Sequence, residues 1–195
     1  MKGVSCVKNI FILMISVCLF LGITTCLIDD PTKFTIHEPF QYSILPGTDE
    51  WKNFNSLEEK IDACHIPQEI LDEMDTEWLV ESVINYPLLG NIHFFSTHGG
   101  GYQSVRSYFD GLVTLETRSD AGDYLYDYLM DIKDLKDVDM VTFWSLEVII
   151  AQPVFYDSLS IFQKAKLEKQ IDKLHALVGE DVSSNVFRQA RSDYE

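Results

Sequence analysis

Apolar side chains recur at every third or fourth residue through most of this chain of 195 residues. The clearest run follows Asp120 and places six residues on one face of a helix: Ala121, Tyr124, Leu125, Tyr128, Leu129 and Ile132. An amphipathic helix has this period of about 3.6 residues, whereas a half-buried strand alternates with a period of two. A helix with one apolar face must bury that face against another element, so the run predicts packed helices.

Similar spacing predicts helices through much of the remaining sequence. The best defined cover residues 76–85, 102–115, 139–151 and 158–179, and shorter ones lie between and beyond them. The core face of 158–179 is assigned to six residues: Leu159, Phe162, Leu167, Ile171, Leu174 and Leu177. Gly179 is placed to end that helix. The sum is about seven helices, which predicts a single all-α domain.

The segment 139–151, DMVTFWSLEVIIA, is apolar on nearly all sides. Such a helix is typical of the centre of a bundle, where neighbours cover it all round. The β-branched residues of LEVII also permit a strand, but no neighbouring segment offers a hairpin partner. We therefore predict a central buried helix that Pro153 stops.

The first residues have the composition of an export signal. Lys2 and Lys8 flank a polar opening, and IFILMISVCLFLGI then runs for 14 residues with one serine and one glycine as its only breaks. A membrane span needs ~20 apolar residues, so this stretch fits a secretory signal better. We predict a signal peptide over residues 1–25. An uncleaved anchor is the alternative if TTCLI extends the apolar stretch.

Cys26 stands where a lipoprotein carries its lipid, directly after the apolar part of an export signal. Thr25 departs from the glycine, alanine or serine that usually precedes such a cysteine. The alternative is an ordinary signal peptide that leaves Cys26 as a thiol or disulfide partner. If Cys26 is lipidated, Cys64 is unpaired and is expected to be a small apolar core residue. Membrane association is then expected through the N-terminus only.

Residues 26–50 contain three prolines and no sustained hydrophobic period. This composition predicts an extended tether. The helical domain is then expected over residues 51–195, a length that suffices for one core.

The chain is strongly acidic, with a net charge of −16. The leader holds two of the 15 Lys and Arg and none of the 31 Asp and Glu, so the rest carries 13 against 31, a net charge of −18. Phosphate binding depends on neutralisation by Lys and Arg, so nucleic acid is excluded as a partner. Anionic lipid headgroups are disfavoured for the same reason. A basic partner protein remains compatible with this charge.

The most suggestive motif is IHFFSTHGGGYQS at residues 92–104. A histidine followed by three glycines resembles the oxyanion-hole loop of lipases and esterases. Those enzymes also need a G-x-S-x-G nucleophile elbow, and this sequence has no such motif. We therefore interpret the glycines as a turn that needs positive φ angles before a helix beginning near Tyr102. An anion- or ligand-binding loop remains the alternative, formed by His98, Gly99, Gly100, Gly101 and Tyr102.

The sequence predicts no metal site and no cofactor. His93 and His98 are five residues apart, which is no zinc spacing, and His65 does not complete one. The aspartates of DIKDLKDVD lack the glycine and the closing glutamate of a calcium loop. The catalytic residues of any enzymatic activity stay unknown at this stage.

Five short motifs resemble an uncharacterised family of secreted or surface-attached proteins of anaerobic gut bacteria. They are Ala63-Cys64-His65-Ile66-Pro67, Met74 to Leu79, Tyr86 to Leu89, Phe109 to Leu112 and Arg118 to Ala121. The resemblance covers roughly residues 60 to 152 and implies an exported helical module. It implies no activity, cofactor or catalytic residue, and the triple glycine departs from the family pattern.

Three functional hypotheses follow from these observations. The first is an exported, envelope-tethered helical module that binds a glycan, peptide or protein partner. The second is a hydrolase that acts on cell-wall or dietary polymers. The third is an acidic immunity-type protein that neutralises a basic partner.

Overall fold

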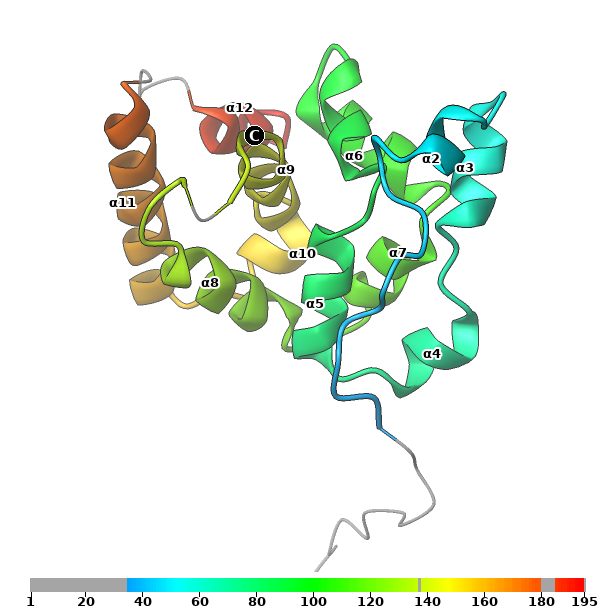
Figure 1. The fold of residues 1–195 in the computed structure, drawn as a ribbon. Coiled ribbons are helices and arrows are strands. Elements are labelled where there is room, and N and C mark those ends of the chain that lie inside the picture. The colour runs from blue at the N-terminus through cyan, green and yellow to red at the C-terminus, as the bar shows by residue number, and fades with distance from the viewer. Residues whose placement is uncertain (1–34, 137, 180–184, 195) are drawn as a thin grey trace, which may run out of the picture. The chain divides into compact units, whose positions relative to one another are not determined.

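The computed structural model describes residues 35–136, 138–179 and 185–194, and these ranges form a bundle of helices (Figure 1). They contain twelve helices and no β-strand, which confirms the all-α prediction with more helices than the seven expected. The helices are α2 (Asp49–Lys52), α3 (Leu57–Ala63), α4 (Gln68–Glu73), α5 (Thr76–Ile84), η1 (Leu89–Phe94), α6 (His98–Arg106), α7 (Asp110–Glu116), α8 (Ala121–Asp131), α9 (Met140–Ile150), α10 (Pro153–Tyr156), α11 (Ile161–Val178) and α12 (Val186–Ser192).

Helix α9 lies at the centre of the bundle, as its apolar composition predicts. Seven of its 11 residues are buried, and it packs against helices on several sides, including α12, η1, α8 and α6. Asp139 caps it by accepting a hydrogen bond from the Thr142 amide. The strand interpretation of LEVII is wrong, because the segment's neighbours are helices that bury it from all sides.

Helix α11 covers one side of the bundle but does not bury all the residues assigned to its core face. Leu167, Ile171 and Leu174 are fully buried, and Leu159, just before the helix, is nearly so. Phe162 is 81% exposed and Leu177 is 59% exposed, so the prediction was wrong for these two. A helix turns by about 100° per residue, which carries Phe162 away from the buried face. Gly179 ends the helix in the left-handed conformation, as predicted.

The described part of the predicted tether lies along the domain from Thr35 onwards. The Ile36 amide donates to the Glu73 carbonyl at 2.9 Å, and the Phe40 amide donates to Ser82 Oγ at 2.8 Å. The Tyr42 hydroxyl donates to the Ser82 carbonyl. The compact unit therefore begins at Thr35, about 15 residues earlier than the boundary expected from composition.

The predicted signal peptide, residues 1–25, and the predicted lipidation site Cys26 lie outside the described residues. Cys64 is a free, buried cysteine, as expected for a small core residue. Among the helices that the structure describes, none combines the length and the apolar character that crossing a bilayer requires.

Candidate ligand-binding cleft

The HGGG motif forms the first turn of α6 and not a loop. Thr97 is the N-cap, and the helix begins at His98, four residues before the expected start. Among the described residues only Gly47 and Gly179 have positive φ angles, so the prediction of a positive-φ turn at Gly99 to Gly101 was wrong.

Close packing surrounds two of these glycines, Gly101 and Gly99. A Cβ on Gly101 would lie 1.9 Å from the Ile92 carbonyl oxygen, because η1 passes directly against α6. A Cβ on Gly99 would lie 3.0 Å from the Tyr194 hydroxyl. Gly101 therefore has no room for a side chain, whereas a methyl group at Gly99 would need only a small shift of the Tyr194 hydroxyl.

The amides of this first turn donate to acceptors of the chain itself. The Gly99 amide donates to Asp193 Oδ2 at 2.7 Å, and the Gly100 amide donates to Thr97 Oγ1 at 3.0 Å. The Gly101 amide donates to the Thr97 carbonyl. A carboxylate thus occupies the positive end of the helix, where the ligand-loop hypothesis places an external anion.

His93 and His98 lie side by side, with ring centroids 6.0 Å apart. His93 Nε2 lies 3.0 Å from Ser145 Oγ, and burial, followed by the nearby His98, lowers the pKa of His93. His93 and Ser145 do not form a nucleophilic dyad. Ser145 is fully buried, and its hydroxyl donates to the Val141 carbonyl and not to the imidazole, so His93 is not placed to take up its proton.

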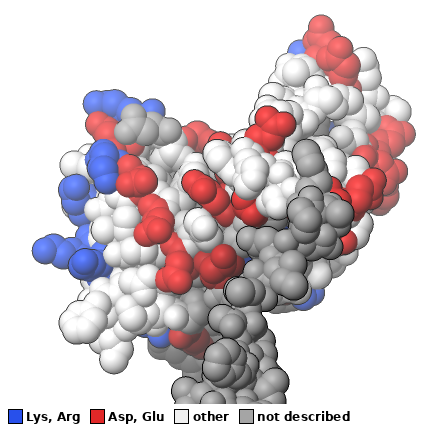
Figure 2. Space-filling model, turned by 90° about the horizontal axis from the view of Figure 1, so that it is seen from below, with Lys and Arg blue, Asp and Glu red and all other residues white. Residues whose placement is uncertain are grey.

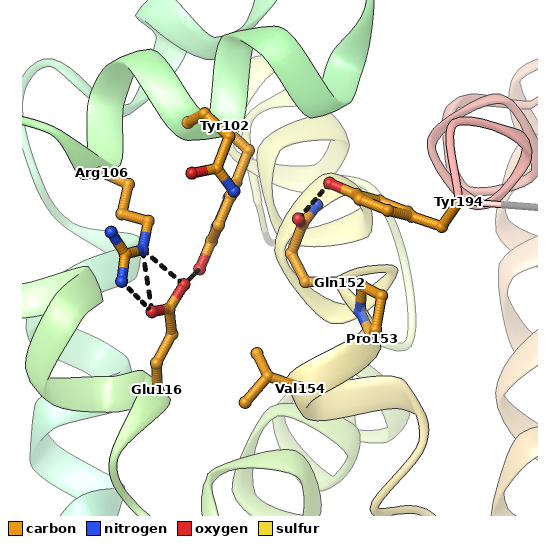
Figure 3. Close-up of a pocket in the computed structure, with 8 residues that line it drawn as sticks. Tyr102, Arg106, Glu116, Gln152, Pro153, Val154 and Tyr194 are labelled. Carbon is orange, nitrogen blue, oxygen red and sulfur yellow. Dashed lines mark hydrogen bonds and ion pairs between the residues drawn. The ribbon is translucent and has the colours of Figure 1, made fainter.

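Tyr102, the last residue of the predicted loop, leads to a different site. Its buried side chain forms part of the wall of an open cleft of about 460 Å³ between α6, α7, α10 and the C-terminal segment (Figure 3). Eight residues line this cleft: Tyr102, Gln103, Arg106, Glu116, Gln152, Pro153, Val154 and Tyr194.

A network centred on Glu116 forms one wall of the cleft. The Tyr102 hydroxyl donates to Glu116 Oε1 at 2.8 Å, and Arg106 Nε and Nη2 donate to the same carboxylate at 2.6 to 2.8 Å. Burial, followed by the charge of Glu116, raises the pKa of Tyr102, so its hydroxyl remains a proton donor. Arg106 and Glu116 balance each other's charge and hold each other's orientation.

The opposite wall is held by Gln152, which is 2% exposed (Figure 3). Its Oε1 accepts a hydrogen bond from the Tyr194 hydroxyl, and its Nε2 donates to the Val148 carbonyl at 2.7 Å. Pro153 and Val154 follow Gln152 and form an apolar ledge, of which Val154 is 46% exposed. The side-chain positions on this wall are therefore fixed before any ligand arrives.

The cleft offers free hydrogen-bonding groups on a rigid frame. Among the described residues, the Gln103 side chain and Arg106 Nη1 have no hydrogen-bond partner. Glu116 is the one carboxylate among the eight lining residues, and it is paired with Arg106. The arrangement is suited to holding a neutral polar molecule rather than to proton transfer between two acids.

Sequence reasoning found Tyr102 of this site but missed its partners. The Tyr102–Glu116 bond joins residues 14 apart, and the Tyr194–Gln152 bond joins residues 42 apart. Glu116 and Tyr102 lie on separate helices, so no periodic pattern links them. The one feature of the sequence that could have indicated this network was Arg106, which lies one helical turn after Tyr102 on the same face of α6.

A second groove lies between α5 and α8 and is acidic. Tyr124, Tyr128 and Val80 form its floor, and four carboxylates surround it: Glu77, Glu81, Asp127 and Asp131. Its volume is about 140 Å³. Burial and the nearby Glu81 raise the pKa of Tyr128. Figure 2 shows acidic side chains across much of this face of the molecule.

The core contains one acidic and one basic side chain that are both fully buried. His175 Nε2 lies 2.7 Å from Glu147 Oε1, and the Phe187 amide donates to Glu147 Oε2 at 3.2 Å. Neither side chain is accessible to a substrate, so we assign the pair a structural role that links α9, α11 and α12.

In the described part of the chain, no cluster of His, Cys, Asp and Glu has the arrangement of a metal site. Comparison with models of known protein families, with curated proteins and with solved structures finds no significant match. The resemblance to the gut-bacterial family therefore stays a prediction.

Proposed function

We propose that this protein is an exported binding module whose cleft between α6, α7 and α10 holds a neutral, hydroxyl-rich ligand such as a glycan. The observation that carries the proposal is the pair of fixed networks, Tyr102–Arg106–Glu116 and Tyr194–Gln152, on facing walls. Although the protein has a net charge of −16, the two charged residues that line this cleft, Arg106 and Glu116, neutralise each other.

Sugars are bound by planar polar side chains that make several hydrogen bonds in a fixed geometry. Arg106 Nη1 and the Gln103 amide supply such groups at the mouth of the cleft, and Tyr194 supplies an aromatic ring. Val154 and Pro153 offer an apolar surface for the C–H face of a ring. Few side-chain rotations need to be frozen on binding, since the networks already hold most of these groups.

A hydrolase is less well supported by this cleft. Glycoside hydrolysis needs two carboxyl groups on opposite sides of the scissile bond. Glu116 has no second carboxylate opposite it among the lining residues, where Gln152 lies instead.

The experiment is a glycan array probed with the protein, followed by calorimetric titration of any hit. Gln103→Ala and Tyr194→Phe should each weaken binding about five- to tenfold, because each removes one hydrogen bond at the cleft. Gln68→Ala is the matched control, since Gln68 bonds Asp72 on the exposed surface of α4. An array without a hit, or cleft variants that bind as tightly as the control, would reject the cleft as a glycan site.

Export and tethering form the second part of the proposal. The apolar stretch after Lys8, with Cys26 at its end, supports an export signal and a lipid anchor. Cys26→Ala should release the protein from the membrane fraction and abolish labelling by a fatty-acid analogue. Unchanged fractionation of this variant would reject the tether.

The acidic groove favours one alternative, namely binding of a basic partner. Glu81 and Asp127 flank two tyrosines there, which suits a lysine or arginine side chain. Binding of a basic protein that weakens steeply with salt, and that the double variant Glu81→Gln/Asp127→Asn abolishes, would support this alternative. Binding that is insensitive to both would reject it.

A further inference from the structure

The outward face of α11 combines exposed apolar and basic side chains. Five residues share this face at helical spacing, from one end of the helix to the other: Phe162, Lys166, Lys169, Lys173 and Leu177. Phe162 is 81% exposed and Leu177 is 59% exposed, and the neighbouring Ile161 is 82% exposed. Ile161 and Phe162 are adjacent and form one exposed apolar spot at the start of α11, and Leu177 forms a second spot at its end, with the lysines between them.

Acidic side chains of the described residues do not neutralise the three lysines of this face. Lys166, Lys169 and Lys173 make no ion pair with any residue in the described ranges. The two acids of α11 are bound elsewhere. Glu168 accepts a hydrogen bond from the Tyr156 hydroxyl at 2.6 Å, and Asp172 pairs with Arg188.

Basic residues are concentrated on α11. Four of the chain's 15 lysines and arginines lie on α11. In Figure 2 many of the blue side chains lie at the left edge, the side on which α11 lies in Figure 1, with red side chains beside them, and the charged side chains over the rest of this view are mostly red. The net charge of −16, from which anionic lipid headgroups are expected to be disfavoured, is therefore an average over the chain that hides one face of opposite sign.

We propose that the outward face of α11 binds the surface of an anionic lipid bilayer. The lysines would contact lipid phosphates, while Phe162, Ile161 and Leu177 enter the boundary of the acyl region. Phe162 and Leu177 are 15 residues apart, so the face is about 22 Å long, and it lies on a straight helix that suits a flat partner. A soluble polyanion would satisfy the lysines but would leave the three apolar side chains in water.

Charge also sets the orientation of the bound protein. Salt screens charges beyond about 8–10 Å, so the acids on other faces weaken binding little once α11 lies on the surface. The site is separate from the cleft. It would orient the domain on a membrane whether or not the glycan proposal holds.

The test is flotation of the full-length protein with two kinds of vesicle, phosphatidylcholine alone and phosphatidylcholine with an equal amount of phosphatidylglycerol. The leader is the same in all variants, so the measured quantity is the gain in binding from phosphatidylglycerol. The triple variant Lys166→Gln/Lys169→Gln/Lys173→Gln should reduce this gain roughly a hundredfold, since each lysine contributes about fivefold. Phe162→Ala should reduce the binding several-fold.

The control is Lys52→Gln/Lys60→Gln, which removes two positive charges on α2 and α3, on the opposite side of the bundle from α11 (Figure 1), and disturbs only the exposed Lys52–Asp49 ion pair and the Lys60–Trp51 contact. It should bind like the unmodified protein. Phe162→Trp adds a local readout, namely a blue shift on phosphatidylglycerol vesicles of the difference in emission between this variant and the unmodified protein, whose three tryptophans supply the background. Equal loss in the control, unchanged binding of either α11 variant, or binding to dextran sulfate without binding to vesicles would each overturn the proposal.

Discussion

The carboxylate of Asp193 accepts a hydrogen bond from the amide of Gly99 at 2.7 Å, across 94 residues of sequence. This bond fastens the C-terminal segment to the N-terminus of α6. It also brings Tyr194 to the cleft, where the tyrosine hydroxyl donates to Gln152. The glycine motif that suggests an oxyanion hole thus serves to dock the end of the chain.

Asp193→Ala should lower the free energy of unfolding by about 1 kcal/mol, because it removes the acceptor and the negative charge at a helix N-terminus. Urea denaturation followed by circular dichroism measures this change. Asp157→Ala is the control, since Asp157 is exposed and makes no hydrogen bond through its side chain to any other described residue. Equal stability of the two variants would contradict the docking role.

Gly101→Ala should destabilise the protein by about 2–3 kcal/mol, because the new methyl group would overlap the Ile92 carbonyl. Gly100→Ala should change the stability by less than about 1 kcal/mol, since position 100 is exposed and faces only the Thr97 side chain. The comparison uses thermal or urea unfolding of both variants. If Gly101→Ala leaves the free energy of unfolding unchanged, η1 does not pack closely against α6.

Glu147→Ala should cost about 3–5 kcal/mol, because it leaves buried His175 and the Phe187 amide without this partner. Glu147→Gln should cost less, since it keeps an acceptor of similar shape. Both are measured by equilibrium unfolding. A loss below about 1 kcal/mol for the alanine variant would show that the pair contributes little to stability.

The free energy of unfolding should fall as the pH is lowered from about 7 to 5, partly because of His93. Its pKa is below the ordinary value of 6.5 in the folded protein, through burial and then through His98. Between these pH values His93 takes up a proton in the unfolded chain but stays neutral in the folded protein, so acid favours unfolding. His93→Gln should flatten this part of the pH profile, whereas His65→Gln, at an exposed position, should keep it. An unchanged slope for His93→Gln would contradict the assignment.

The positions of most helices could be predicted because their signals are local. The stripe after Asp120 became α8, and the apolar segment after Asp139 became the central α9. The end of α5 at Ile84, just before Asn85 and Pro87, also follows from a local rule about proline. Hydrophobic spacing and helix-ending residues such as proline act on neighbours only a few residues away, so a single sequence is enough to locate the helices.

The cleft could not be predicted in the same way. Tyr102 meets Glu116 and Gln152 meets Tyr194 only because α6, α7, α10 and the C-terminal segment pack together. Spacing in the sequence carries no information about such pairs when each partner belongs to a different helix. The glycines of α6 were misread for a similar reason, since the close packing around Gly101 and Gly99 comes from η1 and the C-terminal segment lying against α6.

The sequence by itself determined an acidic, all-helical domain with α9 at its centre, because hydrophobic period and composition act along the chain. Only the tertiary structure decided that Phe162 and Leu177 of α11 face outward beside three lysines that form no ion pair with another described residue. A helix can bury only the face that its neighbours cover, and the neighbours are chosen by packing across the whole domain.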